Sequence, residues 1–440
     1  MWAARLLVLL VVLLLGAAGF VIYTWRPALD PIEPPAKASF DAALVAKGAE
    51  LAAIGDCNRC HTKLGGRPFA GGRPLPTPFG TIYATNVTPD PETGIGRWSE
   101  TAFRRAMREG VDRAGRHLYP AFPYDHFTKA TDEDLRAVYA FLMTRDPVRA
   151  EVPTNKLPFP LNLRFVLAGW KLLFLRQGVF RPDPARDAQW NRGAYLVDGL
   201  GHCGACHTPR NRLGGEERAK ALAGGEAEHW HAPALNAASP APVPWTADSL
   251  FAYLRHGSDA LHGVAAGPMG EVVENLARVP EEDVRAMAAY VASVMGPPTP
   301  ERQSRANQFV EVERAGRNGP GGTGDAMRGH ASSGAGATIY AGACAGCHDV
   351  GELTPPAARP LALYTDVMLP DPRNLIHVIL KGIAPPEGEA GPMMPGFADA
   401  LTDAQVAELA AYVRARFSDG PAWGNIEDQV HRIRQASEAP

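Results

Sequence analysis

Three short stretches of the sequence share one pattern of cysteine and histidine. They are Cys57-Asn58-Arg59-Cys60-His61, Cys203-Gly204-Ala205-Cys206-His207 and Cys344-Ala345-Gly346-Cys347-His348. The chain of 440 residues contains 6 cysteines, so these stretches use all of them. The stretches begin at similar intervals, which indicates an internal repeat. We therefore expect three structural units of the same kind, each about 100 residues long.

The pattern C-x-x-C-H is the attachment site of a c-type haem. The two thiols bond to the two vinyl groups of the haem, and the next residue, histidine, becomes the proximal ligand of the iron. A thioredoxin-like site would need one CxxC in a βαβ setting, and a zinc ribbon would need two CxxC pairs about 15–20 residues apart. Structural disulfides would not require a histidine after every pair. The sequence thus predicts three covalently bound haem c groups, with His61, His207 and His348 as axial ligands.

The flanks of the motifs repeat as well, in the order helix, CxxCH, long loop, helix, loop, helix. Helical spacing of apolar residues predicts a first helix in each repeat at 42–54, 191–200 and 337–341, and a last helix at 131–144, 280–295 and 402–417. We expect a mainly α protein with three tandem cytochrome c domains and an N-terminal transmembrane or signal helix. The expected divisions are a membrane anchor or signal segment at 1–26 and cytochrome c domains at 40–146, 187–297 and 334–420.

The N-terminus carries an apolar run from Leu6 to Tyr23 that contains no charged residue. As a helix it would approach the roughly 30 Å thickness of a bilayer core. A cleaved signal peptide would end in a small-x-small site, and this run ends in Phe-Val-Ile-Tyr-Thr-Trp instead. We expect an uncleaved anchor in the inner membrane with the haem domains in the periplasm, and a cleaved signal is the alternative.

Candidate sixth ligands follow from a glycine at the end of the middle helix of each repeat. Met269 lies twelve residues after Gly257, and Met394 lies twelve residues after Gly382. A haem with a proximal histidine often takes methionine on its other face. We predict Met269 and Met394 as axial ligands and regard the neighbouring Met393 as a lesser candidate.

The first repeat departs from this rule, because Phe122 stands twelve residues after Gly110. Phenylalanine cannot bind iron. His126 is the preferred replacement and His117 a weaker one, and an open sixth position is the alternative. Met107 and Met143 fall on expected helices and are interpreted as core residues.

Other features limit the range of functions. A net charge of −3 does not predict binding of nucleic acid, which would need a basic face. No Rossmann, Walker or GxSxG motif accompanies the haem sites. An apolar stretch from Phe165 to Phe180 reads either as a buried connector or as a helix at the membrane interface, and residues 315–336 read as a flexible Gly/Ser-rich linker. Five further histidines cluster around the second repeat and are expected to be surface residues or partners of haem propionates: His202, His229, His231, His256 and His262.

Several longer strings make the chain resemble the cytochrome c subunits of membrane-bound bacterial dehydrogenases. The strings are TPFGTIYATNVTPD at 77–90, TGIG at 93–96, LYPAFPY at 118–124, GHCGACHTPRN at 201–211 and MPGF at 394–397. The resemblance covers roughly residues 40 to 420. It implies a subunit that takes electrons from a separate catalytic subunit, of the molybdopterin/Fe–S or quinoprotein type, and delivers them to ubiquinone or a terminal oxidase.

Family members of the alcohol dehydrogenase type carry methionine at the place of Phe122. With Phe122 followed by Tyr124-Asp125-His126, this chain is more similar to the subunits paired with molybdenum hydroxylases. This similarity suggests an aldehyde- or N-heterocycle-oxidising complex. The chain itself is then not a catalytic dehydrogenase. Two alternatives are a free-standing periplasmic electron carrier and a haem enzyme that acts at an open first haem, where His117, Asp125 and His126 are the local acid–base candidates.

Overall fold

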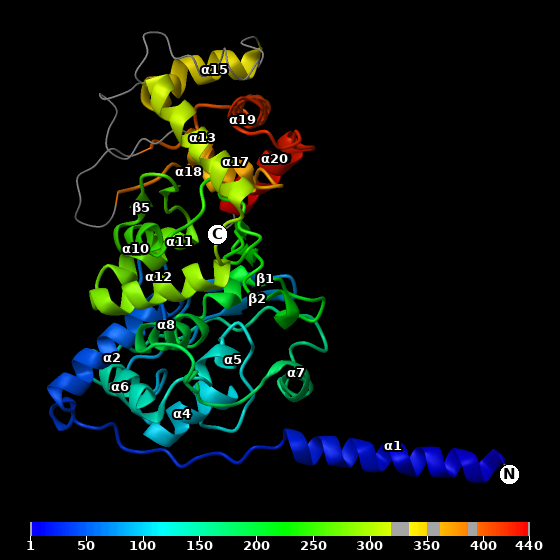
Figure 1. Ribbon diagram of the computed structural model, residues 1–440. Coiled ribbons are helices and arrows are strands. Elements are labelled where there is room, and N and C mark those ends of the chain that lie inside the picture. The colour runs from blue at the N-terminus through cyan, green and yellow to red at the C-terminus, as the bar shows by residue number, and fades with distance from the viewer. Residues whose placement is uncertain (1, 318–333, 350–360, 386–393, 439–440) are drawn as a thin grey trace. The chain divides into compact units, whose positions relative to one another are not determined.

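The computed structural model describes residues 2–317, 334–349, 361–385 and 394–438. The chain divides into two compact units, the first made of Met1–Pro182 with Asp198–His202 and the second of Asp183–Val197 with Cys203–Pro440. Both units are mainly helical (Figure 1). The strands of the described part form three two-stranded antiparallel hairpins and nothing larger.

The N-terminal helix α1 runs from Trp2 to Thr24 and has no residue with a charge after Arg5. Among the described residues it is the only helix that is long and apolar enough to cross a membrane, by length and composition. Most of it stands clear of the other helices of its unit (Figure 1).

The first unit continues with the elements of the first repeat and of the segment that follows it. These are η1 (Lys37–Ser39), α2 (Ala42–Ile54), α3 (Cys57–Cys60), β1 (Pro74–Thr77), β2 (Gly80–Tyr83), α4 (Glu100–Glu109), α5 (Tyr124–Phe127), α6 (Asp132–Met143) and α7 (Val166–Phe174). The predicted helices at 42–54 and 131–144 are confirmed as α2 and α6, which pack on each other. Met107 and Met143 are buried on α4 and α6, as expected of core residues.

The second unit holds the elements around the second and third motifs. Those of the second motif are α8 (Ala188–Asp198, whose last residue belongs to the first unit), α9 (Gly204–His207), η2 (Arg218–Lys220), β3 (Gly225–Ala227), β4 (Trp230–Ala232), α10 (Ala247–His256), β5 (Ser258–Asp259), β6 (Gly263–Val264), α11 (Pro268–Leu276) and α12 (Glu281–Met295). Those of the third are α13 (Pro300–Arg317), α15 (Ala335–Ala343), α16 (Ala345–His348), η3 (Leu361–Leu363), α17 (Thr365–Met368), α18 (Arg373–Lys381), α19 (Asp403–Phe417) and α20 (Ile426–Glu438).

Capping residues explain where the helices begin and end. Thr131 and Thr402 accept hydrogen bonds from the backbone N–H groups of Asp134 and Gln405, and the Gln405 side-chain oxygen accepts one from the Thr402 backbone N–H. The middle helices α4 and α10 end at Gly110 (φ 60°) and Gly257 (φ 74°), in the left-handed conformation that glycine adopts without strain. Helix starts at threonine and helix stops at glycine are signals of local sequence, and the structure uses both.

In all three repeats the first and last helices cross at a glycine. A Cβ atom on Gly48 would lie 1.9 Å from the Ala137 carbonyl oxygen, and one on Gly193 would lie 2.0 Å from that of Ala286. One on Gly336 would lie 2.2 Å from the Glu408 carbonyl oxygen. An aromatic residue at an equivalent place in each last helix packs against each glycine, namely Phe141, Tyr290 and Tyr412.

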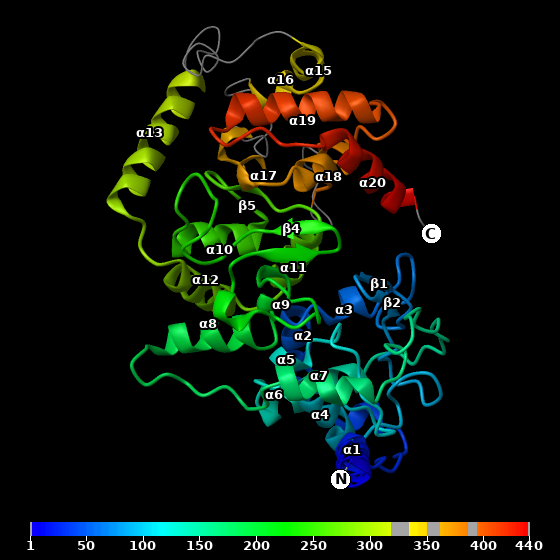
Figure 2. The ribbon, with the colours of Figure 1, turned by 90° about the vertical axis from the view of Figure 1, so that its right-hand side faces the viewer.

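The helix α20 extends the hydrophobic core of the third repeat. Trp423, Val430 and Ile433 are buried in one cluster with α18 and α19, although the expected domain ended at residue 420. Figure 2 shows α19 lying across α17 and α18, with α20 beside them. The core of the third repeat therefore depends on a helix that the sequence pattern did not reveal.

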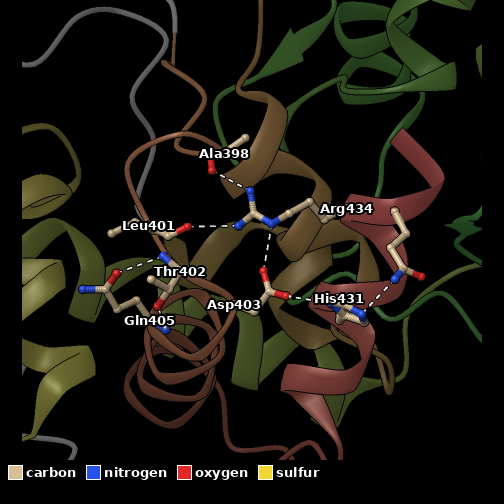
Figure 3. Close-up of polar contacts among 8 residues, drawn as sticks. Ala398, Leu401, Thr402, Asp403, Gln405, His431 and Arg434 are labelled. Carbon is tan, nitrogen blue, oxygen red and sulfur yellow. Dashed lines mark hydrogen bonds and ion pairs between the residues drawn. The ribbon is translucent and has the colours of Figure 1, made fainter. Parts of the chain in front are cut away.

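An arginine holds α20 against the start of α19 (Figure 3). Arg434 donates to the Asp403 carboxylate at 2.8 Å and to the carbonyl oxygens of Ala398 and Leu401. His431 lies 3.1 Å from the same carboxylate. Arg434 and His431 hold the pKa of Asp403 below its ordinary value, so this attachment stabilises the fold above about pH 4 and weakens as the carboxylate is protonated.

The crossing glycines are testable with a matched pair on α15. Gly336→Ala should lower the free energy of unfolding by about 1–3 kcal/mol, because the added methyl group would overlap the α19 backbone. Gly342→Ala on the same helix meets nothing within 4 Å and should be neutral or stabilising by up to about 1 kcal/mol. Urea unfolding of both variants checks this, and equal effects would contradict the crossing.

Candidate haem-binding sites

Each CxxCH motif forms a single helical turn. The backbone N–H of the histidine donates to the carbonyl of the first cysteine in all three, at 3.0 Å for His61, 2.9 Å for His207 and 3.0 Å for His348. Residues at i, i+3 and i+4 share one face of a helix, so the turn places both thiols and the imidazole on the same side. All six cysteines belong to the described residues, and none of them forms a disulfide there.

Loop carbonyls orient the motif histidines His61 and His207. The Nδ1 atom of His61 lies 2.6 Å from the Thr85 carbonyl oxygen, and that of His207 lies 2.6 Å from the Pro233 carbonyl oxygen. A carbonyl accepts only from Nδ1–H, so Nε2 of each neutral ring keeps its lone pair. Burial lowers the pKa of both histidines and favours this neutral form. This is the arrangement of a metal-binding imidazole.

The loops return to the motifs in the same way in the first two repeats. Gly71 donates its N–H to the His61 carbonyl at 2.7 Å, and Gly224 donates to the His207 carbonyl at 2.8 Å. The residue before the first cysteine is left-handed in both, with φ 51° at Asp56 and φ 38° at His202. Residues 350–360, which follow the third motif, lie outside the described part of the chain.

The segments that follow the middle-helix glycine have matching backbone hydrogen bonds in the first two repeats. Leu118 donates to the Gly110 carbonyl and Ala265 to the Gly257 carbonyl, both at 2.7 Å and both eight residues after the glycine. Phe122 and Met269, four residues further on, thus occupy corresponding places. Met269 is the second residue of α11 and is partly buried.

The third repeat holds its methionine by another contact. Ile383 donates to the Met394 carbonyl at 2.9 Å, and Met394 is partly buried beside the end of α18. Met393 lies outside the described residues. The predicted ligands Met269 and Met394 therefore both lie in the segment after the middle helix.

In the first repeat, Phe122 is part of an aromatic cluster and His126 is buried beside it. The Phe122 ring lies 5.3 Å from that of Phe127. His126 lies on α5, with Nδ1 3.0 Å from the Asp198 carbonyl oxygen. This contact has the same chemistry as those of the motif histidines.

His117, the weaker candidate, uses both ring nitrogens for other contacts. Nε2 donates to the Thr24 carbonyl at 2.9 Å, and Nδ1 lies 3.0 Å from the Lys171 ammonium nitrogen. Burial and the nearby Lys171 lower the pKa of His117. With these contacts, His117 has no nitrogen left for iron in this conformation.

A stacked aromatic pair that the sequence did not reveal joins the second and third repeats within the second unit. The Trp230 and His377 rings stack at 4.6 Å with an interplanar angle of 13°. Burial, and then Lys381, lowers the pKa of His377 to about 4, so this imidazole is neutral at physiological pH. Trp230 also packs on Gly267, two residues before Met269. Beside the stack, Asn374 exchanges two hydrogen bonds with the His231 backbone, and Arg373 pairs with Glu226 at 2.7 Å.

The other clustered histidines have structural contacts. His262 is buried, with Nδ1 2.6 Å from Asp259 and its ring stacked on Trp245 at 3.6 Å. His202 lies 2.8 Å from the Leu200 carbonyl and contacts the Phe127 ring. His256 is exposed.

Comparison with known proteins identifies the family. The family model "Cytochrome C oxidase, cbb3-type, subunit III" matches residues 331–413. The fructose dehydrogenase cytochrome subunit of Gluconobacter japonicus is 36% identical over 424 residues, which cover 92% of this chain and 85% of that protein. The chain belongs to the cytochrome c subunits of bacterial dehydrogenases.

Two further relatives agree. The gluconate 2-dehydrogenase cytochrome c subunit of Pantoea cypripedii is 37% identical over 400 residues, 87% of this chain and 86% of that protein. A nicotinate dehydrogenase subunit of Pseudomonas putida is 49% identical over 427 residues, 95% of this chain but 34% of its own length. The cytochrome subunit thus spans about a third of that relative. This chain is an electron-transfer subunit that binds haem c, and the resemblance drawn from the sequence is confirmed.

The predicted role of Met269 as an axial haem ligand can be tested in the cytochrome subunit. Met269→Leu keeps the size of the side chain but removes its sulfur, so it should lower one haem midpoint potential, because methionine ligation raises the potential. Met287→Leu is the control, since Met287 is buried in the α12 core. It should leave all potentials unchanged and cost less than about 1.5 kcal/mol. Redox titration followed by absorbance compares the two, and identical titrations would remove Met269 from the ligand set.

Proposed function

We propose that the cytochrome subunit carries three haem c groups in three tandem cytochrome c domains. Thioether bonds would form at the three cysteine pairs, with His61, His207 and His348 as proximal ligands. Met269 and Met394 would be the sixth ligands of the second and third haems, and His126 that of the first. The observation that carries the proposal is the carbonyl-held Nδ1 of His61 and His207, which leaves Nε2 of each ring able to bind iron.

Haem c supplies a one-electron couple when bound, and the protein contributes its orientation and surroundings. The loop carbonyls of Thr85 and Pro233 fix the tautomer of the imidazoles and raise their basicity. The Trp230–His377 contact and the hydrogen bonds around it hold the second and third repeats in one compact unit. A fixed separation between these two repeats supports electron passage from one to the next.

The proposed electron donor is the catalytic subunit of a dehydrogenase. The 49% identity to the nicotinate dehydrogenase subunit exceeds the 36% and 37% identities to the fructose and gluconate enzymes' subunits. Together with Phe122 at the place of methionine, this favours a molybdopterin/Fe–S partner that oxidises an N-heterocycle or an aldehyde over a quinoprotein partner. Ubiquinone or a terminal oxidase is the proposed acceptor.

The proposed location is the periplasmic side of the inner membrane, with α1 as the anchor. The helix has 23 residues and so a length of about 35 Å, enough for a hydrocarbon core of about 30 Å. Tyr23 and Trp25 at its end are suited to the membrane–water interface.

Purification from the native membrane tests the function. We expect three covalent haems per chain by pyridine haemochrome assay and a co-purifying molybdenum–pterin subunit. The double variant Cys344→Ala/Cys347→Ala should lose one of the three haems and keep the others. Three haems on a lone polypeptide would contradict the dehydrogenase partner, and an unchanged haem count in the double variant would contradict attachment at the third motif.

The first haem has its own test. His126→Ala should convert one low-spin haem to high-spin, because the iron would lose its sixth ligand. His256→Ala changes an exposed histidine and should leave the spectrum as it is. Electron paramagnetic resonance of the oxidised protein distinguishes the spin states, and an unaltered spectrum for His126→Ala would exclude His126 as a ligand.

A further inference from the structure

The helix α7 presents two different faces. Ala168, Lys171 and Leu175, spaced as one helical stripe, are buried against the first repeat. Phe165, just before the helix, forms a second stripe with Leu172 and Leu173, beside the buried one, and these three are 50%, 54% and 58% exposed. Soluble proteins seldom leave a group of large apolar side chains exposed to water. We therefore expect another apolar surface to cover this stripe.

The buried face fixes α7 firmly to its unit. The Lys171 ammonium donates to the carbonyl oxygens of Glu109 at 2.7 Å and Gly110 at 2.6 Å, and it contacts His117. The neighbouring Trp170 meets the buried Tyr124 ring edge-on at 6.1 Å. The contacts of Lys171 and Trp170 therefore fix the position of the exposed stripe.

The same network holds the end of the membrane helix beside α7. His117, bonded to Lys171 on one side, donates to the carbonyl of Thr24, the last residue of α1. Gly169 lies between Phe165 and Leu173 along the exposed stripe, and a Cβ atom there would approach the Phe20 ring to 3.9 Å. The apolar stripe of α7 thus continues the apolar surface of α1 near its periplasmic end.

The charges that follow α7 agree with a bilayer surface. Arg176 and Arg181, both exposed, follow α7 in the sequence. A basic residue near an anionic lipid surface contributes about 1 kcal/mol of attraction. Short amphipathic helices with such flanks lie in the interface with their apolar side chains about 5–10 Å below the headgroups.

We propose that α7 is a second membrane contact, which lies in the outer leaflet of the bilayer beside α1 and inserts Phe165, Leu172 and Leu173. This inference rests on the proposed membrane location of the chain. It gives the first repeat a fixed face toward the membrane, which a single helix followed by an extended segment could not do.

Lipid photolabelling of the full-length holoprotein tests the proposal. The protein is reconstituted in phosphatidylglycerol/phosphatidylethanolamine vesicles that contain a phospholipid with a diazirine in its acyl chain, and labelled peptides are identified by mass spectrometry. We expect label in α1 and in residues 165–174. Leu172→Glu/Leu173→Glu should abolish the label in α7 and keep that in α1, because the two side chains are exposed and their replacement leaves the core intact. Gln177→Glu, an exposed neighbour outside the stripe, should change neither.

The outcomes separate this inference from the proposed anchor. Label in α1 without label in α7 overturns the second contact and leaves the stripe to a protein partner. Label in α7 of a chain whose α1 is unlabelled or cleaved supports the contact and overturns the anchor. Label in neither segment overturns both.

Discussion

The close approach of the first and last helices of each repeat is the constraint on which the rest of the structure depends. Gly48, Gly193 and Gly336 allow two helix backbones to touch, and any side chain there would push them apart. The CxxCH turn follows the first helix closely in each case, so the crossing also sets where the cysteines and the histidine lie. The middle helices α4 and α10 pack on the last helices and carry the loops with the candidate sixth ligands.

Polar contacts from distant loops complete the candidate sites. Thr85 and Pro233 are far from the motifs in sequence, yet their carbonyl groups orient the motif imidazoles. A backbone carbonyl can orient an imidazole whatever side chain its residue carries. The residue types in the sequence therefore do not indicate which carbonyls have this role. The left-handed residues Asp56 and His202 before the first two motifs belong to types that tolerate this conformation and could have been noticed.

The first unit combines a haem motif with the elements that face the proposed membrane. His117 and Lys171 connect the end of α1, the end of α4 and α7 through buried hydrogen bonds. Burial lowers the pKa of Lys171 to about 7, with Arg26 contributing, and the carbonyls of Glu109 and Gly110 would each lose a donor if the lysine were absent. His117, the weaker of the two histidine candidates for the first haem, is thus part of this connection.

The sequence by itself determined the CxxCH motifs, the first and last helix of each repeat and the caps of these helices. It also determined the family. All of these follow from local spacing and residue type. Only the tertiary structure decided the contacts of His117, the Trp230–His377 stack, the attachment of α20 through Arg434 and the exposed stripe of α7. Each of these joins residues that are distant in sequence or depends on which face of a helix is covered. The sequence pattern of a helix indicates that one face is apolar. Only the packing of the folded chain shows whether the protein core or another surface covers that face.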